Sequence, residues 1–228
     1  MSGAYIFDVE GTLIDCVAAN LKCWDETLRS FGVSAPSKQL RLLSGMDGNE
    51  MVATLAPGLD KQARKKILSA QGERYRAHYL PGVRPFAGLR KAFTAIKARG
   101  GRIALATDCQ SDELDHYRGL MDVNDLIDAI ACGDDVSKGK PDPALVELAL
   151  KHLGDAPALS ATMVGDTPFD AQAARRAGAT AWGTLGGCHP RSSLLAAGCS
   201  TVMSSVGDIG RFLNRDKPKA SPLSAHRG

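Results

Sequence analysis

The stretch of sequence that decides the fold is FDVEGTLI, residues 7–14. It continues an apolar run, and two carboxylates, Asp8 and Glu10, interrupt that run where a buried strand would end. In α/β folds, ligands bind at the carboxyl ends of the strands. Gly11 allows the backbone to turn sharply just beyond the two acids. The stretch therefore predicts a strand over residues 4–9 that delivers both carboxylates to a binding site.

The bulk composition is that of an ordinary globular protein. The chain has 228 residues, 44% hydrophobic and 23% charged, which suits one large domain or one domain with an insertion. Its net charge is +3, too small to indicate a nucleic-acid or membrane partner. The short basic run at residues 64–66 is typical of a solvated helix face. We expect a small-molecule ligand, no nucleic acid and no membrane, with a monomer and a homodimer both left open.

The cysteines and the N-terminus indicate the compartment. The six cysteines are Cys16, Cys23, Cys109, Cys132, Cys188 and Cys199. No two have C-x-x-C spacing, so a structural zinc site is not expected, and the set is typical of free thiols in a reducing compartment. The N-terminus has no basic region followed by a long apolar stretch, and no apolar run approaches the ~20 residues of a membrane span. We expect a cytoplasmic protein.

Between the first strand and the next one, the pattern predicts only helices. Helical periodicity covers residues 16–31, 39–44, 49–56 and 60–79. Asp60 is suited to cap the last of these helices. The sequence therefore predicts an all-helical insertion over residues 16–82.

Beyond residue 85, strands and helices alternate. The predicted strands are residues 102–107, 128–132, 161–165, 180–184 and 201–203. The predicted helices are residues 89–99, 112–120, 143–153, 169–177, 192–197 and 206–213. This alternation predicts an α/β fold, with a Rossmann-like parallel sheet and helices on both faces, over residues 1–15 and 83–214. Residues 215–228 lack periodicity and are expected to form a mobile tail.

Polar residues follow four of the predicted strands. They are Asp8 with Glu10, Thr107, Lys140 within the loop 139–143, and Asp166 with Asp170. In a parallel sheet these strand ends converge on one crevice. Packed carboxylates take up protons unless cations compensate, and Lys140 and a magnesium ion are the natural compensation. Such a set suits phosphoryl transfer, and a carboxylate there can act as the nucleophile.

With these four motifs in order, the chain resembles the haloacid dehalogenase superfamily, a large group of mostly magnesium-dependent phosphatases. The resemblance covers residues 4–213 and is far more specific for the superfamily than for a substrate. It is to phosphoglycolate-phosphatase-like and β-phosphoglucomutase-like members, and it implies that residues 16–82 are a helical cap inserted after the first strand. It also implies hydrolysis of a small phosphoglycolate- or sugar-phosphate-like monoester through an aspartyl-phosphate.

The resemblance implies a set of magnesium ligands. Asp8 and Asp166 would bind Mg²⁺ directly, and Glu10 would offer its backbone carbonyl. Asp170 would hold the waters of the metal or orient Lys140.

The resemblance also implies which groups handle the phosphate. Asp8 would attack phosphorus, and the Glu10 side chain would take the place of the general acid/base. Thr107 would hydrogen-bond a phosphate oxygen, and Lys140 would neutralise the nucleophile and the phosphate. The cap loop Gly45-Met46-Asp47-Gly48 is either a turn between helices or, as in phosphoglycolate-phosphatase-like members, a loop that faces the substrate.

Two positions depart from the common pattern. Glu10 stands where Asp is usual, and it is longer by one C–C bond of about 1.5 Å. A catalytic group misplaced by ~1 Å can cost ~10²-fold in rate, so we expect Glu10 to be a working but slower general acid. The enolase-phosphatase branch also carries Glu here, but its cap looks different, so its substrate is not transferred. Asp108 stands among the substrate-contacting candidates where a small neutral residue is usual, and its carboxylate would repel phosphate unless it points away.

Three further residues are expected to have structural rather than catalytic roles. His189 is expected to be a loop residue, with a position at the rim of the site as the alternative. Trp24, at helical spacing, is expected in the core. Cys109 lies near the site in sequence, but nothing makes it catalytic.

Other functions stay open beside the phosphatase. A β-phosphoglucomutase-like mutase would return the phosphate to a sugar. A metal-free dehalogenase is disfavoured by Asp166 and Asp170, and a phosphonate-cleaving enzyme is disfavoured because no cap lysine stands out for a Schiff base. A protein that only binds phosphate esters is the alternative if Glu10 has lost its acid/base role.

Overall fold

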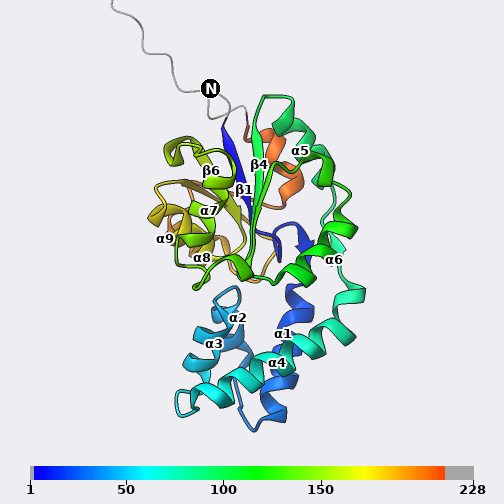
Figure 1. Cartoon of the computed structure of the whole chain (residues 1–228), viewed down its shortest axis with the longest axis vertical. Helices are drawn as coiled ribbons and strands as arrows, with labels where there is room; N and C mark the ends of the chain where they lie inside the picture. The colour runs from blue at the N-terminus through cyan, green and yellow to red at the C-terminus, as the bar shows by residue number, and fades with distance from the viewer. Residues whose placement is uncertain (1–2, 214–228) are drawn as a thin grey trace, which may run out of the picture.

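The computed structural model describes residues 3–213. Within them, a six-stranded sheet with flanking helices forms one part, and a bundle of four helices forms the other (Figure 1). The strand order is β5-β4-β1-β6-β7-β8, and all neighbours run parallel. The strands are β1 (Ala4–Phe7), β4 (Arg102–Ala106), β5 (Ala129–Ala131), β6 (Ala161–Gly165), β7 (Thr180–Thr184) and β8 (Thr201–Met203). The predicted α/β fold class is confirmed.

The register of the central strands brings their ends to one level. Phe7 of β1 pairs with Leu105 of β4 and with Val164 of β6. The residues that follow each strand therefore emerge side by side at the same edge of the sheet. In Figure 1 this edge faces the helical bundle.

Helices cover both faces of the sheet, because successive residues of a buried strand point to opposite sides. Phe7 packs with the buried cluster that includes Phe93 of α5, and the two rings lie 4.8 Å apart. Ile6 packs on the other face, in the cluster that includes Leu145 of α7. The helices of this part are α5 (Leu89–Lys97), α6 (Ser111–Met121), α7 (Ala144–His152), α8 (Pro168–Arg176) and α9 (Arg191–Ala197).

The helical cap consists of α1–α4, with a small apolar core of its own. The helices are α1 (Val17–Ser30), α2 (Ser37–Leu43), α3 (Gly48–Leu55) and α4 (Lys61–His78). Leu28, Leu40, Val52 and Ile67 are buried together. Asp60 caps α4 as predicted, because its side chain accepts a hydrogen bond from the Ala63 N–H at 2.7 Å.

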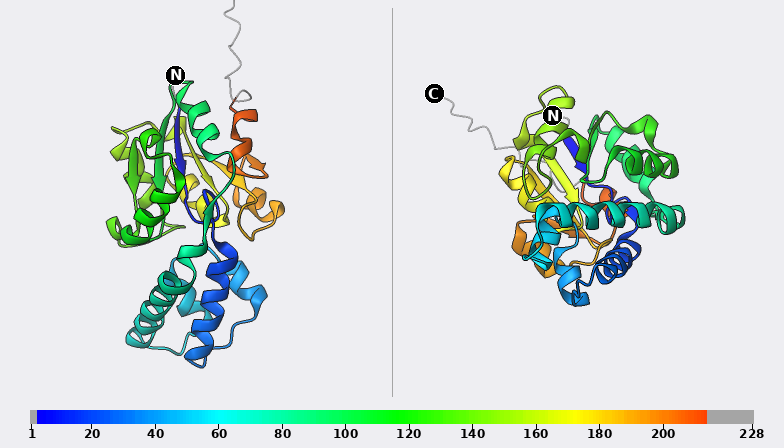
Figure 2. Two further views of the ribbon diagram at one scale, coloured as in Figure 1. Left: turned by 90° about the vertical axis from the view of Figure 1, so that its right-hand side faces the viewer. Right: turned by 60° about the horizontal axis from the view of Figure 1, so that its bottom comes forward.

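Two chain segments join the cap to the sheet part, and the left view of Figure 2 shows them side by side. They pair as short antiparallel strands, β2 (Ile14–Asp15) and β3 (Arg84–Pro85). The sequence did not predict this pair, because two residues are too few to show the alternation of a strand.

One further prediction is wrong, and another concerns residues outside those that the structure describes. Residues 206–213 were expected to form an α-helix, but Val206–Arg211 is a 3₁₀-helix. The tail at residues 215–228 lies outside the described residues. Within residues 3–213, no helix combines the length and the apolar character needed to cross a membrane.

Candidate active site

A buried lysine lies at the centre of the carboxylates that follow the strands. Lys140 is only 2% exposed, and its Nζ lies 2.6 Å from Asp8 Oδ1 and 2.8 Å from Asp170 Oδ1. Asp108 Oδ2 is 3.4 Å away. Burial alone would lower the pKa of Lys140, but Asp170 and Asp8 raise it well above its usual range. The Lys140 side chain is therefore positively charged and lies against Asp8, the expected nucleophile.

Three of the carboxylates also form a group that suits a metal ion. Ligand oxygens of Asp8, Asp166 and Asp170 lie within 4.8 Å of one another, and all three residues are buried. Thr12 Oγ1 donates to Asp166 Oδ1 at 3.1 Å and orients it. Buried hard oxygen ligands of this kind fit Mg²⁺.

In this group, three buried carboxylates lie near the ammonium ion of Lys140. Burial raises the pKa of Asp8 to about 8, although Lys140 opposes this, and burial together with Asp8 raises the pKa of Asp166 well above its usual range. One lysine therefore does not compensate the buried acids. A divalent cation held by Asp8 and Asp166 would do so.

Two glycines leave room for the Asp166 carboxylate. A Cβ added at Gly11, where φ is +77°, would lie 2.5 Å from Asp166 Oδ2. A Cβ at Gly187 would lie 1.8 Å from the same oxygen. Sequence reasoning singled out Gly11 for its turn but missed Gly187, which lies 21 residues beyond Asp166 on another loop.

Asp170 has a structural duty as well. Its Oδ2 accepts hydrogen bonds from the Thr167 backbone N–H at 3.0 Å and from Thr167 Oγ1 at 2.7 Å. Thr167 in turn caps α8, so the two residues form a capping box. Of the two roles expected for Asp170, the contact with Lys140 is present in the structure. The role toward metal-bound water stays a prediction.

The Glu10 side chain is held by a tyrosine that sequence reasoning missed. Tyr117 of α6 donates its hydroxyl to Glu10 Oε1 at 2.8 Å, and Tyr75 of α4 lies 2.8 Å from the Tyr117 hydroxyl. Burial raises the pKa of Glu10, and the hydrogen bond from Tyr117 opposes the rise. A raised pKa favours the protonated form of the Glu10 carboxyl, which is the form that a general acid needs.

The two residues after β4 lie in different environments. Thr107 is buried, and its Oγ1 accepts a hydrogen bond from the Cys109 N–H at 3.3 Å. Asp108 Oδ1 accepts the Lys140 backbone N–H at 2.9 Å. The Asp108 carboxylate is thus engaged by Lys140, although Asp108 also lines the cavity described below. Burial raises the pKa of Asp108.

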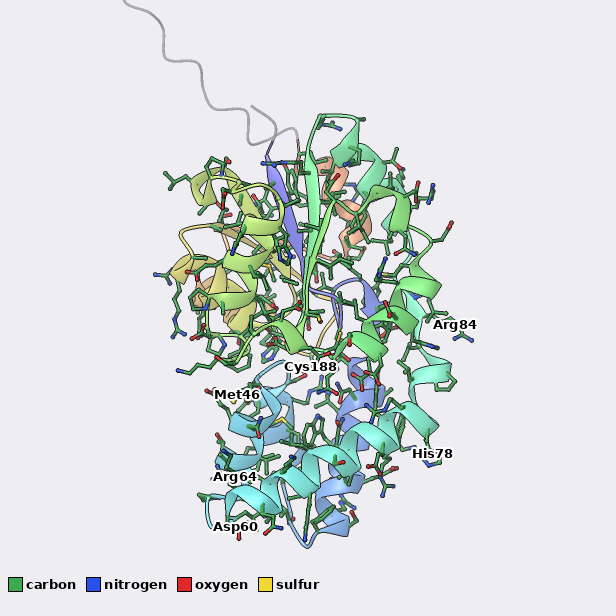
Figure 3. The ribbon with its side chains drawn as sticks, viewed as in Figure 1. Met46, Asp60, Arg64, His78, Arg84 and Cys188 are labelled. Carbon is green, nitrogen blue, oxygen red and sulfur yellow. The ribbon has the colours of Figure 1, made fainter. Side chains whose placement is uncertain are left out.

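The cap loop packs against the sheet part. Gly45 has φ +83°, and a Cβ there would lie 2.4 Å from Thr167 Cγ2. His189 is buried, and its Nε2 lies 3.0 Å from the Ser44 carbonyl oxygen. Figure 3 labels Met46 and Cys188 on opposite sides of this boundary. His189 is a loop residue, as expected, in the segment between β7 and α9, and it also forms a contact between the two parts.

A cavity of about 690 Å³ lies between the cap and the strand ends. Its lining includes all the sequence-predicted site residues, namely Asp8, Glu10, Gly45, Met46, Asp47, Thr107, Asp108, Lys140, Asp166 and Asp170. The cap adds the basic residues Lys61, Lys65 and Arg76. Trp24 was expected in the core, but it is only partly buried against the cap core and also lines the cavity. The sequence thus predicted the floor of the cavity well and most of its cap wall not at all.

The chain is similar to known proteins over most of its length. The model of the haloacid dehalogenase-like hydrolase family matches residues 5–183. The chain is 26% identical to a phosphoglycolate phosphatase of Rhodospirillum rubrum, over 99% of this chain and 96% of that one. It is also 26% identical to a phosphorylated carbohydrates phosphatase of Thermotoga maritima, over 88% of this chain and 93% of that one.

A solved structure extends the likeness to three dimensions. The crystal structure of a hydrolase from Pseudomonas syringae superimposes with a TM-score of 0.87, at 26% identity, and covers 94% of this chain and 99% of that one. The family match spans more than half of the chain and includes all four motifs, from Asp8 to Asp170. The chain therefore belongs to the haloacid dehalogenase-like hydrolase family.

Proposed function

We propose that the protein is a magnesium-dependent phosphatase that hydrolyses a small phosphate monoester through an aspartyl-phosphate on Asp8. The observation that carries the proposal is the contact of Lys140 Nζ with Asp8 Oδ1 at 2.6 Å, beside the carboxylates of Asp166 and Asp170. A buried ammonium ion in this place holds the nucleophile in position and, together with a bound Mg²⁺, would favour its ionised form. It also offsets the negative charge that a phosphate brings.

In the first half of the reaction, an Asp8 oxygen attacks phosphorus and the ester bond to the leaving alcohol breaks. Lys140 holds Asp8 Oδ1 at 2.6 Å, and Oδ2, which accepts a long hydrogen bond of 3.5 Å from Thr12 Oγ1, forms the new bond. Glu10 gives its proton to the leaving oxygen. Mg²⁺, when held by Asp8, Asp166 and the Glu10 carbonyl with Asp170 nearby, would supply further neutralisation of the phosphate charge.

In the second half, water replaces the alcohol. Glu10, now ionised, takes a proton from a water molecule that attacks phosphorus, and the bond to Asp8 breaks. Free phosphate leaves, and Glu10 carries a proton again. The same carboxyl therefore serves as acid and then as base, as the order of the two steps requires.

The size and lining of the cavity support a small substrate. A volume of about 690 Å³ is within the range of small-molecule sites. The loop at Gly45, Met46 and Asp47 closes one side, and Lys61 and Lys65 bring positive charge to the cap wall. Relatives named for phosphoglycolate and for phosphorylated carbohydrates make these two ester classes the first to test.

The test is a panel of phosphate monoesters, assayed for free phosphate with and without magnesium. We expect magnesium-dependent release by the wild type and none by Asp8→Asn. The matched control is Asp15→Asn, which changes an exposed acid of the same segment and should keep full activity. Turnover by Asp8→Asn would rule out the aspartyl-phosphate.

The panel also separates the alternative functions. A mutase would interconvert sugar phosphates and release little free phosphate. A protein that only binds esters would show tight binding without turnover. Either result would contradict the proposed phosphatase.

A further inference from the structure

The carboxyl that we assign to proton transfer is held from behind by two buried tyrosines. Tyr117 is fully buried and Tyr75 is 2% exposed. The hydroxyl of Tyr117 bonds Glu10 Oε1 at 2.8 Å, and the two tyrosine hydroxyls lie 2.8 Å apart. A buried hydroxyl without a hydrogen-bond partner is costly, and these two hydrogen bonds give both tyrosine hydroxyls a partner.

The direction of the hydrogen bonds follows from counting protons. A tyrosine hydroxyl has one proton to donate. Because the Tyr117 proton goes to the Glu10 carboxylate, the proton between the two tyrosines comes from Tyr75. Burial raises the pKa of Tyr117 and of Tyr75 far above the usual range, so both hydroxyls keep their protons.

The arrangement leaves one oxygen of Glu10 for the substrate. Both protein contacts of its carboxyl fall on Oε1, from Tyr117 at 2.8 Å and from Cys16 Sγ at 4.0 Å. Within residues 3–213, Oε2 accepts no hydrogen bond. Glu10 lines the cavity, whereas Tyr117 does not. Oε2 is thus the oxygen placed to exchange a proton with a bound ligand.

The length of Glu10 now has a reason. An aspartate in this position would end about 1.5 Å short and would withdraw from the Tyr117 hydroxyl. The longer side chain reaches a donor on α6, on the sheet part of the molecule, 107 residues away in sequence. The glutamate side chain has one more rotatable bond than aspartate, and the hydrogen bond from Tyr117 restricts its rotation.

We propose that Tyr117, supported by Tyr75, is a positioning residue that fixes Glu10 for proton transfer to the leaving group. The inference rests on the proposed phosphatase function. Tyr117 touches no substrate, and its effect passes entirely through the Glu10 carboxyl.

The test compares Tyr117→Phe with wild type on two esters. One is p-nitrophenyl phosphate, whose leaving group departs without a proton. The other is the alkyl phosphate that the wild type hydrolyses fastest, whose leaving group needs one. Rapid-quench measurement follows the first turnover, because later turnovers also need Glu10 as a base.

We expect Tyr117→Phe to slow the first turnover of the alkyl phosphate about 10- to 100-fold, with KM nearly unchanged. Release of the first equivalent of p-nitrophenol should stay within about twofold of wild type, because that step needs no acid. In a Glu10→Gln background, Tyr117→Phe should have no further effect on the alkyl phosphate.

The matched control is Tyr79→Phe. It removes a hydroxyl that donates to Glu26 Oε2 at 2.8 Å, the same kind of bond, from a tyrosine that does not line the cavity. It should leave both esters unaffected.

The outcomes separate this inference from the proposed function. Equal losses on both esters, or a full effect in the Glu10→Gln background, would show that Tyr117 is only structural. Wild-type rates on the alkyl phosphate would also overturn the inference. An inactive wild type would instead contradict the phosphatase itself.

Discussion

Asp8 and Glu10 are two residues apart, yet the structure holds their carboxyl groups by different means. Asp8 lies against the Lys140 ammonium ion at 2.6 Å, in a cluster of charges. Glu10 lies against a neutral tyrosine hydroxyl at 2.8 Å. The difference matches the two proposed tasks: a nucleophile must be ionised, so a cation serves it, whereas an acid must keep a proton, which a cation would expel.

The largest effect is expected where the charged cluster is broken. Lys140→Met removes the counter-ion of Asp8 and Asp170, so both carboxylates lose the positive charge that orients them. We expect kcat to fall about 10³-fold or more, as for the loss of other preorganised charge partners. Steady-state phosphate release measures it, with circular dichroism to show that the variant folds.

The control for this variant is Lys138→Met, an exposed lysine of the same loop. It should retain wild-type activity. A folded Lys140→Met enzyme with more than a tenth of wild-type kcat would contradict the role of Lys140.

A smaller effect is expected where the charged cluster is only displaced. In Gly187→Ala, the new Cβ would lie 1.8 Å from Asp166 Oδ2 in the present geometry, so the carboxylate must move. Because a displacement of ~1 Å can cost ~10²-fold, we expect about a 100-fold loss of activity that extra magnesium partly restores. Gly119→Ala, where a Cβ would meet nothing within 4 Å, is the control. Unchanged magnesium dependence in Gly187→Ala would argue against Asp166 as a metal ligand.

The charged cluster around Asp8 and the contact between Glu10 and Tyr117 differ in how far the sequence predicted them. Three of the site residues directly follow apolar runs that are clearly predicted to be buried strands, namely Asp8, Thr107 and Asp166. Lys140 lies in the loop beyond a fourth such strand, and the strand order predicts that all four converge. β6 and β7 have the predicted bounds, since each is a short apolar run with clear ends.

The roles of Tyr117 and Gly187 could not be predicted, because no local pattern marks either residue as part of the site. Tyr117 is one apolar position of an amphipathic helix, and only the packing of α6 brings its hydroxyl to Glu10. Gly187 lies in a loop whose close approach to Asp166 depends on the path of the whole chain. The β2–β3 pair was missed for a similar reason, since its strands are brought together by the cap between them.

The tyrosine side of the comparison predicts an unusual result for Glu10→Asp. The change restores the residue that is common in the resembling superfamily, yet the shorter side chain would lose the Tyr117 hydrogen bond. We expect about a tenfold loss of kcat on alkyl phosphates rather than a gain. Glu26→Asp, which shortens the partner of Tyr79 in the same way, is the control and should keep full activity. A faster Glu10→Asp enzyme would show that the extra length of Glu10 is a handicap that Tyr117 does not offset.

The smallest effect is on thermal stability, and its dependence on pH follows from the pKa of Asp8. Burial raises the pKa of Asp8 from 3.8 to about 8, against the opposing effect of Lys140, so without metal the folded state holds a proton that the unfolded state lacks between these pH values. The metal-free protein should therefore lose stability as pH rises from about 4 to about 8. Mg²⁺ competes with that proton, so the increase in Tm that a fixed magnesium concentration produces should grow, by a few degrees, between pH 5.5 and pH 8. Thermal unfolding with and without the metal measures this.

Two variants test which residues hold the cation. Asp166→Asn should lose most of the increase in Tm at every pH, whereas Tyr117→Phe should keep it, because the tyrosine holds the acid and not the metal ligands. An increase in Tm that is the same at all pH values would mean that the cation binds away from Asp8.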